Sequence, residues 1–184
     1  MLKITIPACP EQYDELTNTF LPATKEQTLT LEHSLVSISK WEAKWHKPYL
    51  DKEEKPIEET IDYIRCMTLT QNVDPNVYTA LSAFPRILQQ VSVYINQPMT
   101  ATTFSKRNES PNKEIITSEL IYYWMVAYNI PFDPCQKWHL SRLLTLINIC
   151  NVKNAPQKKM SRQETLAKNR ALNAARRKKM NTRG

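Results

Sequence analysis

Cysteine and histidine are the side chains of this sequence best suited to metal binding or nucleophilic chemistry, and their spacing argues against both. The four cysteines form no Cys-x-x-Cys pair, and the three histidines lie far apart. His139 follows Cys135 by four residues, which would place both on one helix face. Two ligands do not make a zinc site, and no second pair lies nearby. We therefore expect free buried thiols, with no metal, no cofactor and no catalytic cysteine.

Paired carboxylates are the other candidates for chemistry, at Glu53-Glu54 and Glu58-Glu59. Both pairs lie in polar sequence near an expected helix start, and nothing places them in a cleft.

The only glycine is Gly184. This excludes the glycine-rich dinucleotide loop, the phosphate loop that ends in Gly-Lys-Ser/Thr and the Gly-x-Ser-x-Gly elbow. The sequence predicts a protein that is not an enzyme.

Positive charge is concentrated at the C-terminal end of the chain. Residues 153–184 hold eleven Lys and Arg and one acid, a charge of +10, whereas residues 1–152 hold fourteen basic and seventeen acidic residues, a charge of −3. We expect a domain over 1–152 and a basic arm over 153–184 that is helical or disordered until it binds an anionic partner. The candidate partner-binding residues of the arm are Lys158, Lys159, Arg162, Arg170, Arg176, Arg177, Lys178 and Lys179.

Hydrophobic periodicity predicts a mainly helical fold with a small β element at the N-terminus. Residues 2–6 (LKITI) alternate as a strand does, with 28–31 as the expected partner and a loop or short helix near 11–20 between them. Proline, aspartate and asparagine mark the helix ends, because glycine is missing. Helices are expected over 32–46, from 56 to 67, from 74 to 82, from 85 to 95, over 114–129 and from 133 onward.

The helix expected over 114–129 is apolar on every face, which is typical of a helix buried on all sides. We expect it to be central in the core or to be partly covered by a partner. It would pair with the next helix, across the short connection NIPFDP, as an antiparallel helical hairpin. We expect this hairpin to be the hub of the fold, with Trp124, Leu143 and Leu144 buried in it. The most apolar run, 120–127, is far shorter than the ~20 residues that cross a bilayer, so no membrane segment is expected.

Five runs of this sequence can be compared with a known family: LEHSLVSISKWEAKW (31–45), PMTATTFS (98–105), IITSELIYYWM (115–125), WHLSRLLTLINICNVKN (138–154) and KKMSRQETLAKNRALNAARRKKMNTRG (158–184). Together they resemble small tail-morphogenesis proteins of tailed bacteriophages, over most of the chain from residue 28 onward. The resemblance implies a tail assembly chaperone that binds the tape-measure protein in the host cytoplasm. It equally implies a structural protein of the neck or tail of the virion, whose basic arm locks onto neighbouring subunits.

Aromatic residues supply further candidates for partner binding, because Trp and Tyr dominate interface hot spots. The candidates are Trp41, Trp45, Tyr122 and Tyr123, and the alternative is that they are core residues. A homo-oligomer is a further alternative, and so is nucleic acid, since the arm would neutralise up to about ten phosphates. Nucleic acid is the less favoured partner, because the arm has no aromatic residue to stack on bases.

Overall fold

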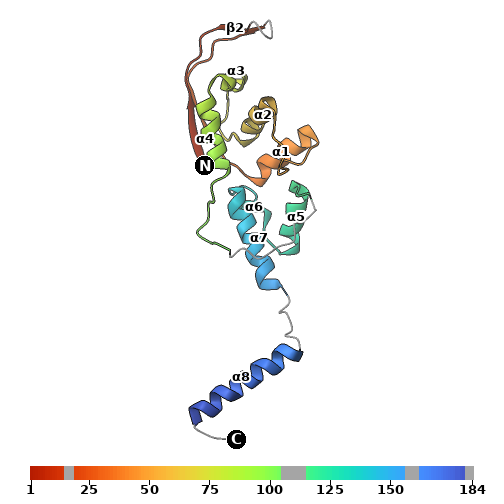
Figure 1. The fold of residues 1–184 in the computed structure, drawn as a ribbon. Helices are drawn as coiled ribbons and strands as arrows, with labels where there is room; N and C mark the ends of the chain where they lie inside the picture. The colour runs from red at the N-terminus through yellow and green to blue at the C-terminus, as the bar shows by residue number, and fades with distance from the viewer. Residues whose placement is uncertain (15–18, 105–114, 156–161, 181–184) are drawn as a thin grey trace. The chain divides into compact units, whose positions relative to one another are not determined.

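The computed structural model describes residues 1–14, 19–104, 115–155 and 162–180. The chain divides into two compact units, residues 1–150 and residues 151–184 (Figure 1). Helices make up most of the described chain, and the strands lie within the first 31 residues. The mainly α fold with a small N-terminal β element is therefore confirmed.

A two-stranded antiparallel ribbon forms the N-terminal part of the first unit. Strand β1 (Leu2–Ile6) pairs with β4 (Gln27–Leu31), and β2 (Gln12–Asp14) pairs with β3 (Thr19–Leu21). The isolated bridge between Cys9 and Thr24 has the same register, so the two pairs belong to one ribbon. The ladder is interrupted between them, where Pro7, Pro10 and Pro22 lack the N–H group that a ladder needs.

The expected pairing of residues 2–6 with 28–31 is confirmed, but the expected loop or short helix near residues 11–20 is wrong. Strands β2 and β3 occupy that region, with Tyr13 opposite Phe20. Aromatic and β-branched residues fit a pleated ribbon better than a short helix, which explains the difference. Residues 15–18 lie outside the described residues. The free edge of β4 is extended on its other side, since Leu69 N donates to the Thr30 carbonyl oxygen.

Within the described ranges, eight α-helices follow the ribbon, with one turn of 3-10 helix at Leu81–Ala83. The α-helices are α1 (Leu35–Trp45), α2 (Ile57–Met67), α3 (Pro75–Ala80), α4 (Pro85–Ile95), α5 (Ser118–Ala127), α6 (Phe132–Cys135), α7 (Leu140–Asn154) and α8 (Arg162–Met180). The helix starts predicted at Asp74-Pro75 and Pro85 are confirmed. Asn129 adopts the left-handed conformation (φ 53°) just after α5, as expected. Helix α1 ends at Trp45, close to the expected end at residue 46, and its C-cap His46 is also left-handed.

The core is centred on α1, which packs against both α2 and α5. Leu35, Ile38 and Trp41 form the buried face of α1. One side of the ribbon and the inner faces of α2, α5 and α7 close around it. Their buried side chains include Ile4, Ile6, Leu29 and Leu31 from the ribbon, Tyr63, Ile64 and Met67 from α2, Ile121 and Met125 from α5, and Leu140, Leu143 and Ile147 from α7.

Two expectations about the hub are wrong. Helix α5 is not central in the core, because Ile121 and Met125 face the core while Tyr123 is 65% exposed and Val126 60% exposed. The alternative that a partner covers this helix stays a prediction. The next long helix does not begin at Asp133-Pro134: residues 132–135 form the short α6, and α7 begins at Leu140. The reason is a backbone bond from Leu140 N to the His33 carbonyl oxygen (2.8 Å), which ties this segment to the end of β4.

The burial expected inside the hairpin is confirmed only in part. Leu143 is fully buried, as expected, whereas Trp124 and Leu144 are half-buried. Half-burial follows from the position of α1, which occupies the central place that we had assigned to α5. The core therefore forms between helices that are distant in sequence rather than within one hairpin.

Candidate partner-binding surfaces

Trp41 and Trp45 join α1 to α2. The Trp41 Nε1 group donates to the backbone oxygen of Glu59 (3.0 Å), and the Trp45 Nε1 group donates to Asp62 Oδ2 (2.9 Å). The two indole rings are stacked, with centroids 6.2 Å apart. Trp41 is buried and Trp45 half-buried. Trp41 thus exposes almost no surface to a partner. It is a core residue, which was the alternative to partner binding.

Two buried carboxylates on α2 hold lysines from α1 and from the loop after it. Lys44 forms an ion pair with Asp62, and Lys47 Nζ lies 2.8 Å from Glu59 Oε1. Both carboxylates are buried while both lysines are exposed. The pair Glu58-Glu59 therefore has one solvated member and one structural member, which is not an acid–base arrangement. Sequence reasoning missed this role because the partners lie 12 and 18 residues away.

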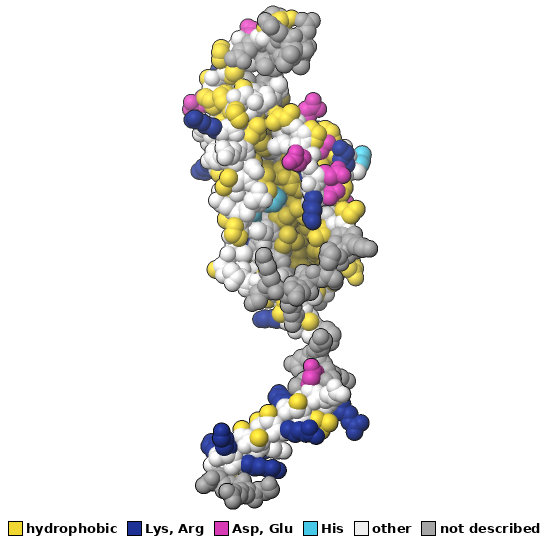
Figure 2. Space-filling view, in the orientation of Figure 1, with side chains coloured by type: hydrophobic (Ala, Val, Ile, Leu, Met, Phe, Trp, Pro, Cys, Tyr) yellow, Lys and Arg dark blue, Asp and Glu magenta, His cyan; other side chains and the backbone are white. Residues whose placement is uncertain are grey.

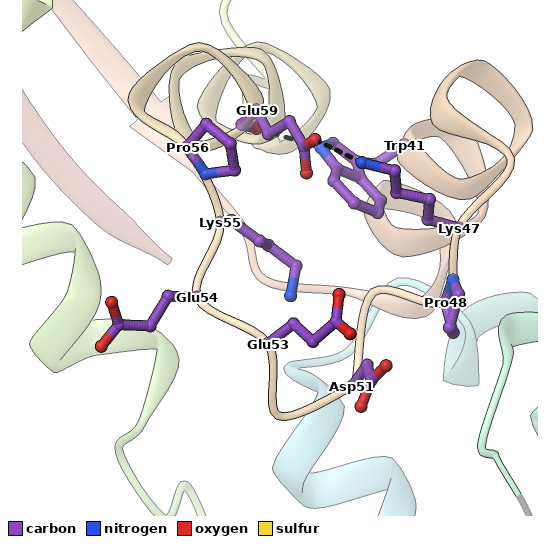
Figure 3. Close-up of a pocket in the computed structure, with 9 residues that line it drawn as sticks. All are labelled: Trp41, Lys47, Pro48, Asp51, Glu53, Glu54, Lys55, Pro56 and Glu59. Carbon is purple, nitrogen blue, oxygen red and sulfur yellow. Dashed lines mark hydrogen bonds and ion pairs between the residues drawn. The ribbon is translucent and has the colours of Figure 1, made fainter.

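A small cavity lies beside these ion pairs, where the loop between α1 and α2 turns back (Figure 3). Its volume is about 100 Å³, well below the roughly 300 Å³ at which small-molecule sites begin. Lys55 Nζ lies 4.9 Å from the centre of the Tyr49 ring and 5.7 Å from that of Trp41. Glu54 points away from the cavity. The cavity is too small for a substrate. The Lys55 ammonium group inside it lies over the Tyr49 and Trp41 rings.

A buried cluster of histidine and tyrosine joins the ribbon to three helices. His33 Nδ1 is hydrogen-bonded to the Tyr63 hydroxyl, and the rings of His33 and His139 lie 5.1 Å apart. His139 Nε2 is bonded to the Tyr94 backbone oxygen (3.2 Å), and the Tyr94 hydroxyl donates to Glu32 Oε1 (2.8 Å). His139 therefore contacts His33 and Tyr94. Among the described residues, no three Cys, His, Asp or Glu side chains are placed to hold a metal ion.

Burial controls the protonation of this cluster. Desolvation, together with a smaller effect of the neighbouring His139, lowers the pKa of His33 to about 3. Desolvation also lowers the pKa of His139. Desolvation raises the pKa of Tyr63 well above its ordinary value. Both imidazoles are therefore neutral at physiological pH, and the cluster is a structural contact between elements.

An apolar groove lies between α2 and α4. Its volume is about 480 Å³, within the range of binding sites for small ligands and side chains. Ile64 and Val91 form its buried floor, and Leu88 and Ile95 are half-buried along it. Glu53, Glu54 and Lys55 line its edge on the loop before α2. Figure 2 shows hydrophobic side chains at the bottom of a hollow, with acidic side chains along one side. No sequence signal identified this groove, because its two walls come from separate helices.

The two aromatic candidates on α5, Tyr122 and Tyr123, differ in their exposure to solvent. The Tyr122 ring meets the Phe132 ring edge to face, with centroids 5.5 Å apart, and its hydroxyl donates to Gln136 Oε1 (3.2 Å). Tyr123 is exposed on the other side of the helix, next to Val126. Of the four aromatic candidates, Tyr123 is the one that offers most of its ring to a partner.

The basic candidates lie on α8. Arg162, Arg170, Arg176, Arg177, Lys178 and Lys179 all belong to this helix, and every residue of the helix is exposed. Lys158 and Lys159 lie outside the described residues. Figure 2 shows basic side chains along α8 with hydrophobic side chains between them.

Comparisons with protein families, curated sequences and solved structures find no match to this chain. Among the described helices, none combines the length and the apolar character needed to cross a bilayer. The surfaces above therefore stand on their own geometry.

Proposed function

We propose that this chain is a non-enzymatic protein of bacteriophage tail morphogenesis, a tail assembly chaperone that binds the tape-measure protein in the host cytoplasm. The resemblance of five sequence runs to small tail-morphogenesis proteins is one support. The observation that carries the proposal is α8, a helix of 19 residues in which every residue is exposed. An isolated helix of this length is marginal in water, so a bound partner would stabilise it.

A long helical partner such as a tape-measure protein needs its apolar stripes covered before assembly. The groove between α2 and α4 and the exposed ring of Tyr123 are surfaces of suitable character. Helix-in-groove binding uses apolar anchors three or four residues apart, which an 11-residue helix wall such as α4 accommodates. The basic arm would add an electrostatic component that salt weakens.

Coexpression with the tape-measure protein tests the proposal. We expect the full chain to keep the tape-measure protein soluble and to copurify with it. A chain that ends at residue 157 should lose most of this binding, whereas Glu11→Gln, an exposed change in the ribbon, should retain it. A tape-measure protein that is equally soluble with and without the full chain would contradict the proposal.

The second candidate function is a structural protein of the neck or tail of the virion. The N-terminal ribbon favours it, because its distal part carries largely exposed residues such as Pro10, Glu11 and Tyr13. A ribbon of two strands is marginal by itself and gains from a neighbouring subunit. Mass spectrometry of purified particles separates the two functions: stoichiometric presence supports the structural role, and absence supports the chaperone.

A further inference from the structure

The groove between α2 and α4 has one acidic edge and one uncharged edge. On the side of α2, Glu53 and Glu54 are exposed at the edge, while Lys55 rests on the Tyr49 ring. On the side of α4, Ser92 and Asn96 are exposed. The floor between them is apolar. A groove of this kind fits a helix with an apolar face flanked by positive charge.

Helix α8 carries its three large apolar side chains on one side, among polar and basic residues. At 100° per residue, Leu166, Leu172 and Met180 fall within an arc of about 120°. Thr165, Asn169 and Asn173 share the arc, together with Arg162 and Arg176. Four of the other basic residues flank the arc and Lys178 lies opposite it, and the helix carries seven basic residues and one acid in all. All three large apolar side chains are about half exposed or more, which is costly for a helix without a partner.

The spacing of the apolar side chains also matches. Leu166 and Leu172 lie about 9 Å apart along α8, since a helix rises 1.5 Å per residue. Leu88 and Ile95, the half-buried residues of the groove, lie about 10 Å apart along α4 by the same rise. Both Leu side chains of α8 can therefore enter one groove. Each copy carries both a groove with an acidic edge and a basic helix, so the contact can form between two molecules.

We propose that the α2–α4 groove of one copy binds helix α8 of a second copy, so that the chain associates with itself through its basic arm. Leu166 and Leu172 enter the apolar floor, and Arg170 and Arg177, just outside the arc, meet Glu53 and Glu54 at the edge. Self-association and partner binding then compete for the same helix. The inference does not rest on the role in tail assembly: a monomer that keeps the tape-measure protein soluble would overturn it and leave that role intact.

Analytical ultracentrifugation of the full chain tests the inference. We expect concentration-dependent association that weakens as salt is raised. Leu172→Asp should raise the dissociation constant at least about tenfold. Ala171→Asp is the matched control, because it adds the same charge on the opposite face of α8. It should retain association close to the wild type.

The groove has its own pair of variants. Ser92→Arg places a long cation in the groove at an exposed position and should raise the dissociation constant at least about tenfold. Gln90→Arg, exposed on α4 outside the groove lining, is the control. The Leu172→Asp and Ser92→Arg chains should each be monomeric alone and associate when mixed, because the mixture restores one intact groove and one intact helix.

Three outcomes would overturn the inference. The first is a full chain that stays monomeric at every concentration. The second is that Ala171→Asp and Gln90→Arg weaken association as much as Leu172→Asp and Ser92→Arg do. The third is that the mixture of Leu172→Asp and Ser92→Arg chains fails to associate. Circular dichroism of each variant checks that the fold is retained, which exposed substitutions on α4 and α8 favour.

Discussion

His33 Nδ1 lies 2.5 Å from the hydroxyl oxygen of Tyr63, and both side chains are buried. The bond joins the end of the β4 strand to the middle of α2. His139 lies against the other side of the imidazole, and Tyr49 contacts both His33 and Tyr63. Charge on His33 would therefore enter a site whose nearest titratable groups are another imidazole and two phenols, with no carboxylate bonded to it.

We predict that the protein loses stability as the pH falls below about 6.5. The pKa of His33 is about 3 in the folded chain, lower than its ordinary value, so the unfolded chain takes up this proton first. Stability is then fully present above pH 6.5 and falls toward pH 3. One such group contributes a slope of about 1.4 kcal/mol per pH unit, or about 2 kcal/mol between pH 6.5 and pH 5. Urea unfolding across this range measures the slope.

The variant His33→Gln separates this effect from other titrating groups. Glutamine keeps a hydrogen-bonding side chain opposite Tyr63 but does not titrate. The slope of unfolding free energy against pH should fall by about 1.4 kcal/mol per pH unit, and the remainder should reflect His139, whose pKa is also lowered by burial. Equal slopes in the two proteins would show that His33 does not control acid stability.

Glu42 is predicted to be the most sensitive carboxylate of the fold. Its Oε1 accepts from the Tyr49 backbone N–H and its Oε2 from the Ser118 backbone N–H, each at 2.8 Å. It thereby joins α1 to the following loop and to the start of α5. Glu42→Ala leaves two N–H groups without this acceptor and should cost about 2–5 kcal/mol in unfolding free energy. Glu54→Ala, at an exposed loop position, is the control and should cost less than about 0.5 kcal/mol.

Removal of the Ser118 hydroxyl, in contrast to removal of the Glu42 carboxylate, is predicted not to destabilise the fold. The Ser118 side chain is fully buried, and its hydroxyl oxygen has no hydrogen-bond partner in the described part of the chain. Ser118→Ala removes this unsatisfied group and keeps the backbone bond to Glu42, so stability should stay constant or rise by up to about 1 kcal/mol. Thr117→Ala provides the contrast: it removes the cap of α5, where Thr117 accepts from Leu120 N, and should cost about 1 kcal/mol. A large loss from Ser118→Ala would indicate a partner for the hydroxyl.

Local signals were enough to predict the elements whose ends depend on a few neighbouring residues. Asp74 accepts from Asn76 N within its own turn, and the alternation of residues 2–6 needs no distant contact to be read. Local signals could not predict which face of a helix is buried. Helix α5 is apolar nearly all round, so composition could not indicate that Ile121 and Met125 would face α1 while Tyr123 would not.

The contacts that position the candidate surfaces were also beyond sequence reasoning. Lys47 and Glu59 are 12 residues apart, and Tyr94 reaches Glu32 across 62 residues. No periodicity relates such positions, because each pair is brought together by the packing of α1, α2 and α4 against the ribbon. The groove between α2 and α4 follows from the same packing. The basic arm, by contrast, needed only a count of charges along the chain.

Helix α8 should contribute little to the stability of the first unit, and this is the last prediction. Its nineteen residues are all exposed, and the first unit contains the entire buried core among the described residues. A chain that ends at residue 157 should therefore unfold at nearly the same temperature as the full chain when both are dilute. Its circular dichroism per residue should change only by the loss of a marginal helix. Thermal scans at several protein concentrations make the measurement decisive: a shared midpoint at low concentration confirms that the arm is separate from the fold. A midpoint that drops by more than about 4 °C at every concentration, equivalent to roughly 1 kcal/mol or more, would show that α8 is part of the folded unit.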